Sequence, residues 1–499
     1  MKHIINIINQ SFFSFSGRLF AIVFGVLYKF YLVDKLEDPT YALGLLGLVI
    51  SFISITTSFT SLGFSKAANR FIPLWKTQNN HSHTTDFIKT SILVSLFTSL
   101  ILAFLLWVYQ DYIISAFSFD TQTSDLKRFL IWFLILMVSR NLLDIFQSII
   151  VAVKEVKTNV SFGVFFNLGL KFTLVLALLY LGYDLKGYIF GETIAIFITS
   201  IIFLYLVVTK IPTKGILSFP KTTFINKEFR SYTLSMLLLA ILAILSGNMD
   251  KILLAKLSIN DLGVYTMTLL FTPFIGMILY SVNSIFAPII SEIFSNGELK
   301  KLDELYQFFT KWTLLLTTPL FIFLMSFRNE VLLFFGKDFV VGSSALAVLI
   351  IGQMISVGFG SVGIILQMTG KHVKVLKIYF LQTLIVLVLM FVLIPKYGII
   401  GAAISSSMGV LLSNLFNYSI VYKAYKLVPY KKETVRIFTT LIISYLLSYF
   451  IYHFITKEVT FLSFFLNFMI AVVVTLTFSR ILCFSPEDKS VFQRIFTKK

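Results

Sequence analysis

Seven charged side chains interrupt long apolar stretches of this sequence, and their types define the chemistry that the chain could do. The basic ones are Arg18, Arg140, Lys171 and Lys251, and the acidic ones are Asp144, Glu192 and Asp250. A charge at the centre of a membrane helix costs about 2.5–3.5 kcal/mol on insertion scales, so such residues usually face a protein interior or a watery path. We identify no catalytic residue and no metal site among them, and we expect no cofactor.

The four basic residues suit an anionic group that must cross a medium of low dielectric constant. Ammonium and guanidinium donors would offset the cost of burying a diphosphate, and the planar guanidinium fits phosphate oxygens in pairs. Arg18 ranks first among them, because it lies in the cytoplasmic half of its predicted helix. A substrate loaded from the cytoplasm would meet this half of the helix first.

The three carboxylates could couple transport to an ion gradient by taking up H⁺ or Na⁺. Other interpretations remain open. Arg140 and Asp144 are four residues apart on one helix and could simply neutralise each other. Asp250 and Lys251 are adjacent, so they point in different directions and need separate partners. Glu192 lies toward the outer end of its helix, where water could solvate it.

The composition predicts the helices that must hold these residues. Of 499 residues, 57% are hydrophobic and 13% are charged, whereas soluble domains carry about 25% charged residues. About fourteen apolar stretches approach the length of ~20 residues that a bilayer requires. They cover roughly 8–33, 41–64, 87–109, 127–153, 158–182, 186–209, 231–257, 262–292, 302–327, 339–369, 373–394, 398–422, 434–455 and 459–483. We therefore predict an all-α polytopic membrane protein.

The net charge of +18 follows the predicted topology. Basic residues cluster at 210–230, 423–436 and 480–499, segments that an N-terminus inside the cell places in the cytoplasm, with the C-terminus there too. Contact with anionic lipid headgroups is a by-product of this pattern, and nucleic acid is not an expected partner. Cys483 is the only cysteine, so no intrachain disulfide can form. The phosphate-binding loop of ATPases is absent as well.

Two weak internal matches agree in order and predict a repeat. Residues 32–36 resemble residues 253–257, and residues 185–192 resemble residues 396–403 in the spacing of glycines. We predict a six-helix bundle over 1–210, a basic cytoplasmic linker over 211–230, a second six-helix bundle over 231–425, and two additional helices with a basic tail over 426–499. Paired bundles of this kind usually work by rocking around a central site.

A helical hairpin over 393–409 separates two of the apolar stretches. Pro395 should end one helix, and Gly398 permits a sharp reversal. Small residues then recur at helical spacing, as Gly401, Ala402 and Ser405, and should give the next helix a smooth packing face.

Four segments carry a resemblance to a known family: residues 61–75, residues 247–256 with 262–265, residues 367–371, and the hairpin. Together they resemble the polysaccharide or oligosaccharide flippase branch of the multidrug/oligosaccharidyl-lipid/polysaccharide exporter superfamily. The resemblance implies a multi-pass protein of the bacterial inner (plasma) membrane. It also implies transport, by alternating access, of undecaprenyl-diphosphate-linked O-antigen, capsule or exopolysaccharide repeat units from the inner to the outer leaflet.

The partners implied by this resemblance are the lipid-linked oligosaccharide, membrane lipids, H⁺ or Na⁺ as coupling ion, and polymerase and chain-length regulator proteins. Three alternatives stay open. A lipid II flippase would share fold and carrier, while a multidrug/cation antiporter would favour a lumen dominated by carboxylates. A membrane O-antigen polymerase or ligase would need a large outer loop, and the outer loops predicted here are short. We therefore expect a transporter and not an enzyme.

Overall fold

The computed structural model describes residues 2–116, 123–210, 224–369, 372–430, 436–455 and 461–482. Helices make up nearly all of these residues, and no strand occurs among them. Ten helices within the described ranges are long and apolar enough to cross a membrane, and the bent pair Ile259–Leu269 and Thr272–Asn283 would make an eleventh span. The prediction of an all-α polytopic membrane protein is thus confirmed, and the exact count of fourteen spans stays a prediction.

The chain packs as two compact units. Unit 1 comprises Met1–Leu270 and Tyr379–Ser405, and unit 2 comprises Phe271–Ile378 and Ser406–Lys499. This grouping follows packing and does not report on repeats in the sequence. The four-segment division of the sequence therefore stays a prediction.

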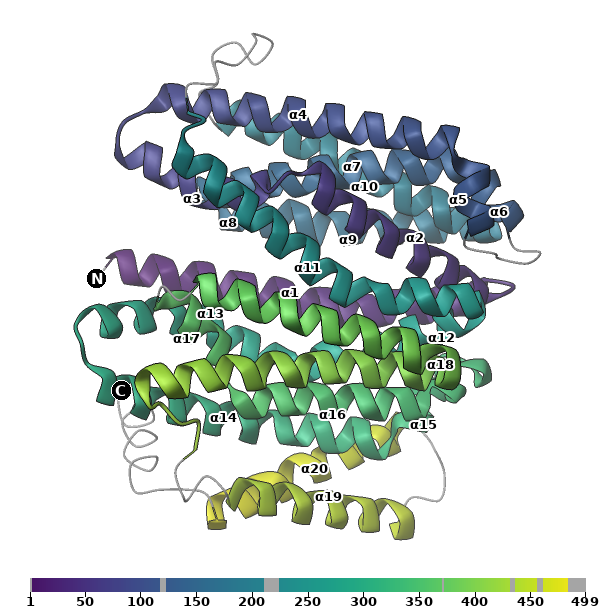
Figure 1. Cartoon of the computed structure of the whole chain (residues 1–499). Helices are drawn as coiled ribbons and strands as arrows, with labels where there is room; N and C mark the ends of the chain where they lie inside the picture. The colour runs from purple at the N-terminus through teal and green to yellow at the C-terminus, as the bar shows by residue number, and fades with distance from the viewer. Residues whose placement is uncertain are drawn as a thin grey trace. The chain divides into compact units, whose positions relative to one another are not determined.

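Unit 1 begins with the long helix α1, and Figure 1 shows α4, α7 and α10 lying alongside one another within it. Its helices are α1 (Lys2–Lys35), α2 (Pro39–Thr60), α3 (Phe64–Thr77), α4 (His81–Val108), α5 (Gln110–Ala116), α6 (Thr123–Arg128), α7 (Leu130–Ala152), α8 (Val156–Val160), the π-helix η1 (Ser161–Phe166), α9 (Asn167–Tyr180), α10 (Asp184–Lys210), α11 (Lys227–Leu257) and α12 (Ile259–Leu269).

Unit 2 holds the later helices, and one long element contributes to both units. The helices that belong to unit 2 alone are α13 (Thr272–Ser295), α14 (Leu299–Ser326), α15 (Arg328–Leu333), the 3-10 helix η2 (Lys337–Gly342), α16 (Ser343–Phe359), α17 (Val362–Met368), α19 (Arg436–Ile455) and α20 (Phe461–Leu482). Helix α18 (His372–Tyr425) is two helices joined at Gly398, whose backbone is non-helical with φ 52° and ψ −126°. The break lies at Gly398, as the sequence predicts, whereas Pro395 lies inside the first helix and does not end it. Ala402 and Ser405 beyond it are fully buried, as a packing face requires.

Helices α2 and α12 of unit 1 pack through a reciprocal glycine contact. A Cβ at Gly44 would overlap the carbonyl oxygen of Ile259, and a Cβ at Gly263 would overlap that of Thr40. Gly44 and Gly263 are 219 residues apart, as are Thr40 and Ile259, so the contact has the same form from both sides. The glycines permit this approach because they carry no Cβ that would meet the facing backbone.

Candidate functional site

Helices α9 and α10 form an antiparallel hairpin that carries the candidate site. The turn between them includes Gly182 in the left-handed region at φ 84°. Gly191 faces the backbone of Val175, where a Cβ would come within 2.9 Å of the Val175 Cα. The two helices can therefore approach closely along the hairpin, and this approach brings together side chains that are distant in sequence.

Lys171 of α9 and Glu192 of α10 form a buried ion pair at this contact. The Lys171 Nζ lies 2.6 Å from Glu192 Oε2 and donates a hydrogen bond of 2.8 Å to Oε1. The side chains are only 20% and 5% exposed. Sequence analysis assigns these two residues different roles, one for the substrate and one for the coupling ion. The structure joins them in a single site.

Helix α1 adds a second lysine and a tyrosine, and α10 adds another tyrosine. Lys29 Nζ donates a hydrogen bond of 3.1 Å to Tyr188 Oη. Lys171 Nζ lies 5.2 Å from the centre of the Tyr28 ring. The Tyr28 Oη is buried and has no hydrogen-bond partner in the part of the chain that the structure describes. We call these five residues, Tyr28, Lys29, Lys171, Tyr188 and Glu192, the α1–α9–α10 cluster.

The cluster holds two lysines and one carboxylate, so basic groups outnumber acidic ones. Buried charges are costly unless they are paired and hydrogen-bonded, and Glu192 pairs with only one of the two lysines in the structure. The arrangement favours an additional anion, which would compensate the second ammonium. It disfavours a metal cation at Glu192, because two ammonium groups already lie nearby. Within the described ranges, no three His, Cys, Asp or Glu side chains converge as a metal site would require.

Sequence reasoning missed three members of this cluster. It identified neither Tyr28 nor Lys29 nor Tyr188 as a site residue, although sequence spacings pointed to Tyr188 and Lys29. Tyr188 precedes Glu192 by four residues and so shares its face of α10. Lys29 follows Arg18 by eleven residues, about three helical turns, which places both on one face of α1.

Asp250 and Lys251 of α11 have separate partners, as their adjacency predicts. The buried carboxylate of Asp250 accepts a 2.8 Å hydrogen bond from Tyr265 Oη of α12. Lys251 Nζ donates to the carbonyl oxygen of Gly247 at 2.8 Å and to Asn248 Oδ1 at 3.1 Å, both on its own helix. Neither residue joins the α1–α9–α10 cluster.

Arg140 and Asp144 of α7 do not form the ion pair that their spacing allows. Asp144 Oδ2 instead accepts a 2.5 Å hydrogen bond from Ser65 Oγ of α3. Arg140 is exposed on α7, and Arg18 is exposed on α1. No ion pair to Arg18 or Arg140 occurs among the residues that the structure describes. Of the seven predicted site residues, the structure thus brings only Lys171 and Glu192 together.

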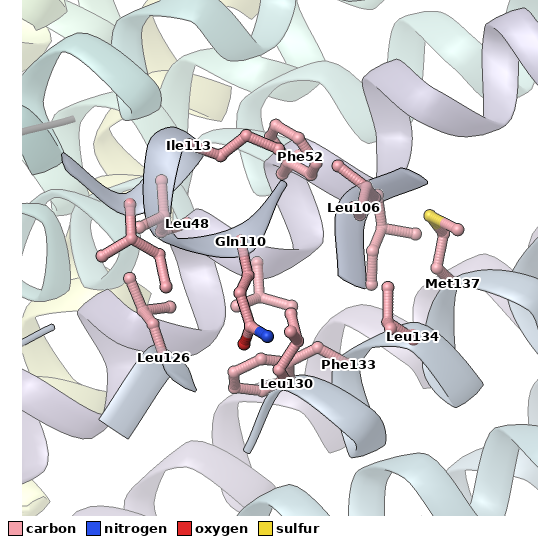
Figure 2. Close-up of a pocket in the computed structure, with 13 residues that line it drawn as sticks. Leu48, Phe52, Leu106, Gln110, Ile113, Leu126, Leu130, Phe133, Leu134 and Met137 are labelled. Carbon is pink, nitrogen blue, oxygen red and sulfur yellow. The ribbon is translucent and has the colours of Figure 1, made fainter. Parts of the chain in front are cut away.

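A separate cavity of about 120 Å³ lies between α2, α4, α5, α6 and α7 (Figure 2). Its walls are apolar apart from the Gln110 carboxamide, which Figure 2 shows among the leucine and phenylalanine side chains. No charged residue lines it, so it does not belong to the ionic site.

Apolar spans around a buried ion pair are typical of membrane transporters, in which charged residues inside the spans mark substrate or ion pathways. The family described as "Polysaccharide biosynthesis protein" matches residues 40–344, more than half of the sequence, and the chain belongs to this family. The predicted resemblance to polysaccharide flippases of the exporter superfamily is thereby confirmed. An uncharacterized membrane protein of Methanocaldococcus jannaschii is 26% identical over 401 residues, which cover 76% of this chain and 77% of that protein.

Solved structures share the fold at low sequence identity. The lipid II flippase MurJ in an inward closed conformation aligns with a TM-score of 0.73 and 16% identity, over 98% of this chain and 100% of that one. An inward-facing multidrug resistance transporter of the MATE family aligns with a TM-score of 0.63 and 16% identity, over 80% and 95%. A transporter of the same superfamily from Pyrococcus furiosus aligns with a TM-score of 0.62 and 15% identity, over 85% and 96%.

Proposed function

We propose that this protein is a flippase that moves an undecaprenyl-diphosphate-linked oligosaccharide from the inner to the outer leaflet of a bacterial plasma membrane by alternating access. The observation that carries the proposal is membership in the polysaccharide biosynthesis family, combined with a transporter fold. Under this proposal both termini are cytoplasmic. The polymerase and chain-length regulator of the same pathway would be its protein partners.

The excess positive charge of the α1–α9–α10 cluster supports a diphosphate as the transported charge. Arg18 and Lys29 share one face of α1, so a phosphate that leaves Arg18 can move along this face toward Lys29 and Lys171. Phosphate oxygens would compete with Glu192 for the Lys171 ammonium, because both are acceptors of charge-assisted hydrogen bonds. Arg140 and Lys251 stay candidates for contacts elsewhere along the path.

Glu192 is the coupling residue that this geometry favours over Asp144 and Asp250. When Glu192 binds a proton, Lys171 loses its counter-ion and becomes available to the diphosphate. Loss of the proton restores the ion pair and displaces the anion. Proton binding and substrate binding at this site would then support each other. The two ammonium groups make H⁺ a better coupling ion than Na⁺ at Glu192.

A lipid II flippase is the second candidate, because the fold match with MurJ covers 98% of this chain and 100% of that one. A multidrug/cation antiporter fits less well, since the cluster carries excess positive charge. Supplying this chain to two bacterial strains tests the proposal, one lacking its oligosaccharide flippase and one depleted of its lipid II flippase. Restored surface glycan in the first strain supports the proposal, and rescued growth of the second strain alone favours the alternative.

A further inference from the structure

A second cavity, of about 330 Å³, lies at one end of unit 1, and none of the residues that line it belongs to the α1–α9–α10 cluster. It forms where four helices begin or end: α3 ends at Thr77, α4 begins at His81, α7 ends at Ala152 and α10 ends at Lys210. The side chains that give it chemistry are Lys76, His81, Thr84, Thr85, Glu155 and Lys210. We call it the end cavity.

The Lys210 ammonium lies at the edge of this cavity, and one of its three N–H donors has no partner among the described residues. Its Nζ lies 2.6 Å from Glu155 Oε2 and 3.1 Å from Thr158 Oγ1. Thr158 donates its own hydrogen bond of 2.7 Å to the same Glu155 oxygen. An ammonium has three N–H donors, so one remains for a further acceptor. Glu155 thus positions Lys210 without using all of its donors.

The other basic side chains of the end cavity have no acceptor. Neither the Lys76 nor the His81 side chain has a hydrogen bond or an ion pair to any residue in the described part of the chain. Both lie beside the first turn of α4, where Asn80 caps the amide of His83. The N-terminus of a helix carries partial positive charge, which adds to that of the lysines. Thr84 and Thr85 place hydroxyl groups on the same turn.

The end cavity lies at the ends of apolar spans, the level at which a bilayer presents its headgroups. Ile72 and Val153 complete its wall with apolar surface. The basic clusters of the sequence assign this end of the spans to the cytoplasm, where anionic lipids are concentrated. A ligand there would be an anion of compact shape, able to accept several hydrogen bonds at once.

We propose that the end cavity binds a phosphate group, held by Lys76, Lys210 and His81 with the Thr85 hydroxyl as an additional donor, since the Thr84 hydroxyl donates to the carbonyl oxygen of Asn80. Phosphate oxygens can accept from all of these groups at once, and hydrogen bonds between charged partners are the strong ones. The phosphate can come from the headgroup of an anionic phospholipid or from free inorganic phosphate. The proposal does not depend on which substrate the protein transports.

Binding to the full chain in detergent tests the proposal with two probes. One is phosphatidylglycerol in mixed micelles, with phosphatidylcholine as the neutral reference, and the other is inorganic phosphate at constant ionic strength. We expect the variant Lys76→Gln/Lys210→Gln to raise the dissociation constant for the bound probe about tenfold or more, because two charged donors are lost. The variant Lys300→Gln/Lys423→Gln removes two exposed lysines outside the cavity and should bind like the wild type.

The variant Glu155→Gln should lower the dissociation constant, whereas Lys76→Gln/Lys210→Gln should raise it. It removes a negative charge that would repel a bound phosphate, while the amide at this position can still accept a hydrogen bond from Lys210, so affinity should rise. This test still decides if the double variant does not fold. Binding of phosphatidylglycerol alone would identify the headgroup as the source, and binding of both probes would show that the phosphate group suffices; either result supports the proposal. Equal affinity of Lys76→Gln/Lys210→Gln and its control, or no gain in Glu155→Gln, would overturn it.

Discussion

The Lys171 ammonium lies 2.6 Å from the Glu192 carboxylate across the α9–α10 hairpin, and both side chains are largely buried. The pair therefore has two consequences that can be separated by experiment. One concerns the folding of unit 1, because a buried charge without its partner is destabilising. The other concerns transport, because protonation of Glu192 would free the ammonium of Lys171.

Removing one charge of the Lys171–Glu192 pair should destabilise the protein more than removing both charges. We expect Lys171→Met to cost about 3–5 kcal/mol, since it leaves the Glu192 carboxylate buried without its counter-ion. The double variant Lys171→Met/Glu192→Gln should recover part of that loss. Thermal unfolding in detergent, followed by tryptophan fluorescence, measures both. Equal unfolding midpoints for the single and double variants would show that the two charges are not coupled.

The glycine contact between α2 and α12 should tolerate no side chain. Gly44→Ala would force a Cβ against the Ile259 carbonyl oxygen, and such overpacking costs about 1–3 kcal/mol. Gly247→Ala is the matched control, because a Cβ there meets no atom within 4 Å. It should be neutral or slightly stabilising, since alanine favours a helix over glycine. The account of this interface is wrong if Gly44→Ala unfolds at the same temperature as Gly247→Ala.

The Glu155–Lys210 pair should make the stability of unit 1 depend slightly on pH in the acidic range. The hydrogen bond from Lys210 and that from Thr158 hold the pKa of Glu155 below its ordinary value of 4.5. A lowered pKa stabilises the folded state above the unfolded pKa, and this contribution disappears as the pH falls through the folded pKa. Glu155→Gln should therefore lower the unfolding temperature at pH 7 and make no difference well below pH 4.

The expected size of this effect is small, because the Lys210 and Glu155 side chains are 34% and 42% exposed. Exposed pairs contribute about 1 kcal/mol or less. If the unfolding temperatures of the wild type and Glu155→Gln differ by the same amount at pH 7 and at pH 3, the lowered pKa of Glu155 does not come from this pair.

Export in cells should depend on Arg18 and on the protonation of Glu192. Arg18→Ala should abolish surface glycan while the amount of protein in the membrane is unchanged, because the exposed arginine forms no ion pair with any residue that the structure describes. Glu192→Gln should also block export, since a side chain that cannot release a proton cannot reset the site. Glycan and protein levels on matched immunoblots measure both variants. Wild-type export in either would remove that residue from the mechanism.

The sequence predicts the elements of this protein better than their contacts. Hydropathy alone indicates the spans, and Gly398 correctly predicts the break inside α18, although Pro395 does not end its helix. Helical spacing says which residues share a face of one helix, but not which helix that face meets. For this reason Lys171 and Glu192 are each predicted as site residues, while their pairing across the hairpin is not. Lys29 was missed because its position near a helix end resembles that of an interfacial anchor.

Translocation by the purified protein tests the central claim most directly. Liposomes would carry a fluorescent undecaprenyl-diphosphate-linked oligosaccharide in one leaflet, and a reductant that cannot cross the membrane would report its arrival in the other. We predict that the wild-type protein accelerates this arrival over protein-free liposomes, and that Arg18→Ala and Glu192→Gln do not. Equal rates with and without the wild-type protein, in liposomes where folded protein is verified, would contradict the proposal that it is an oligosaccharide flippase.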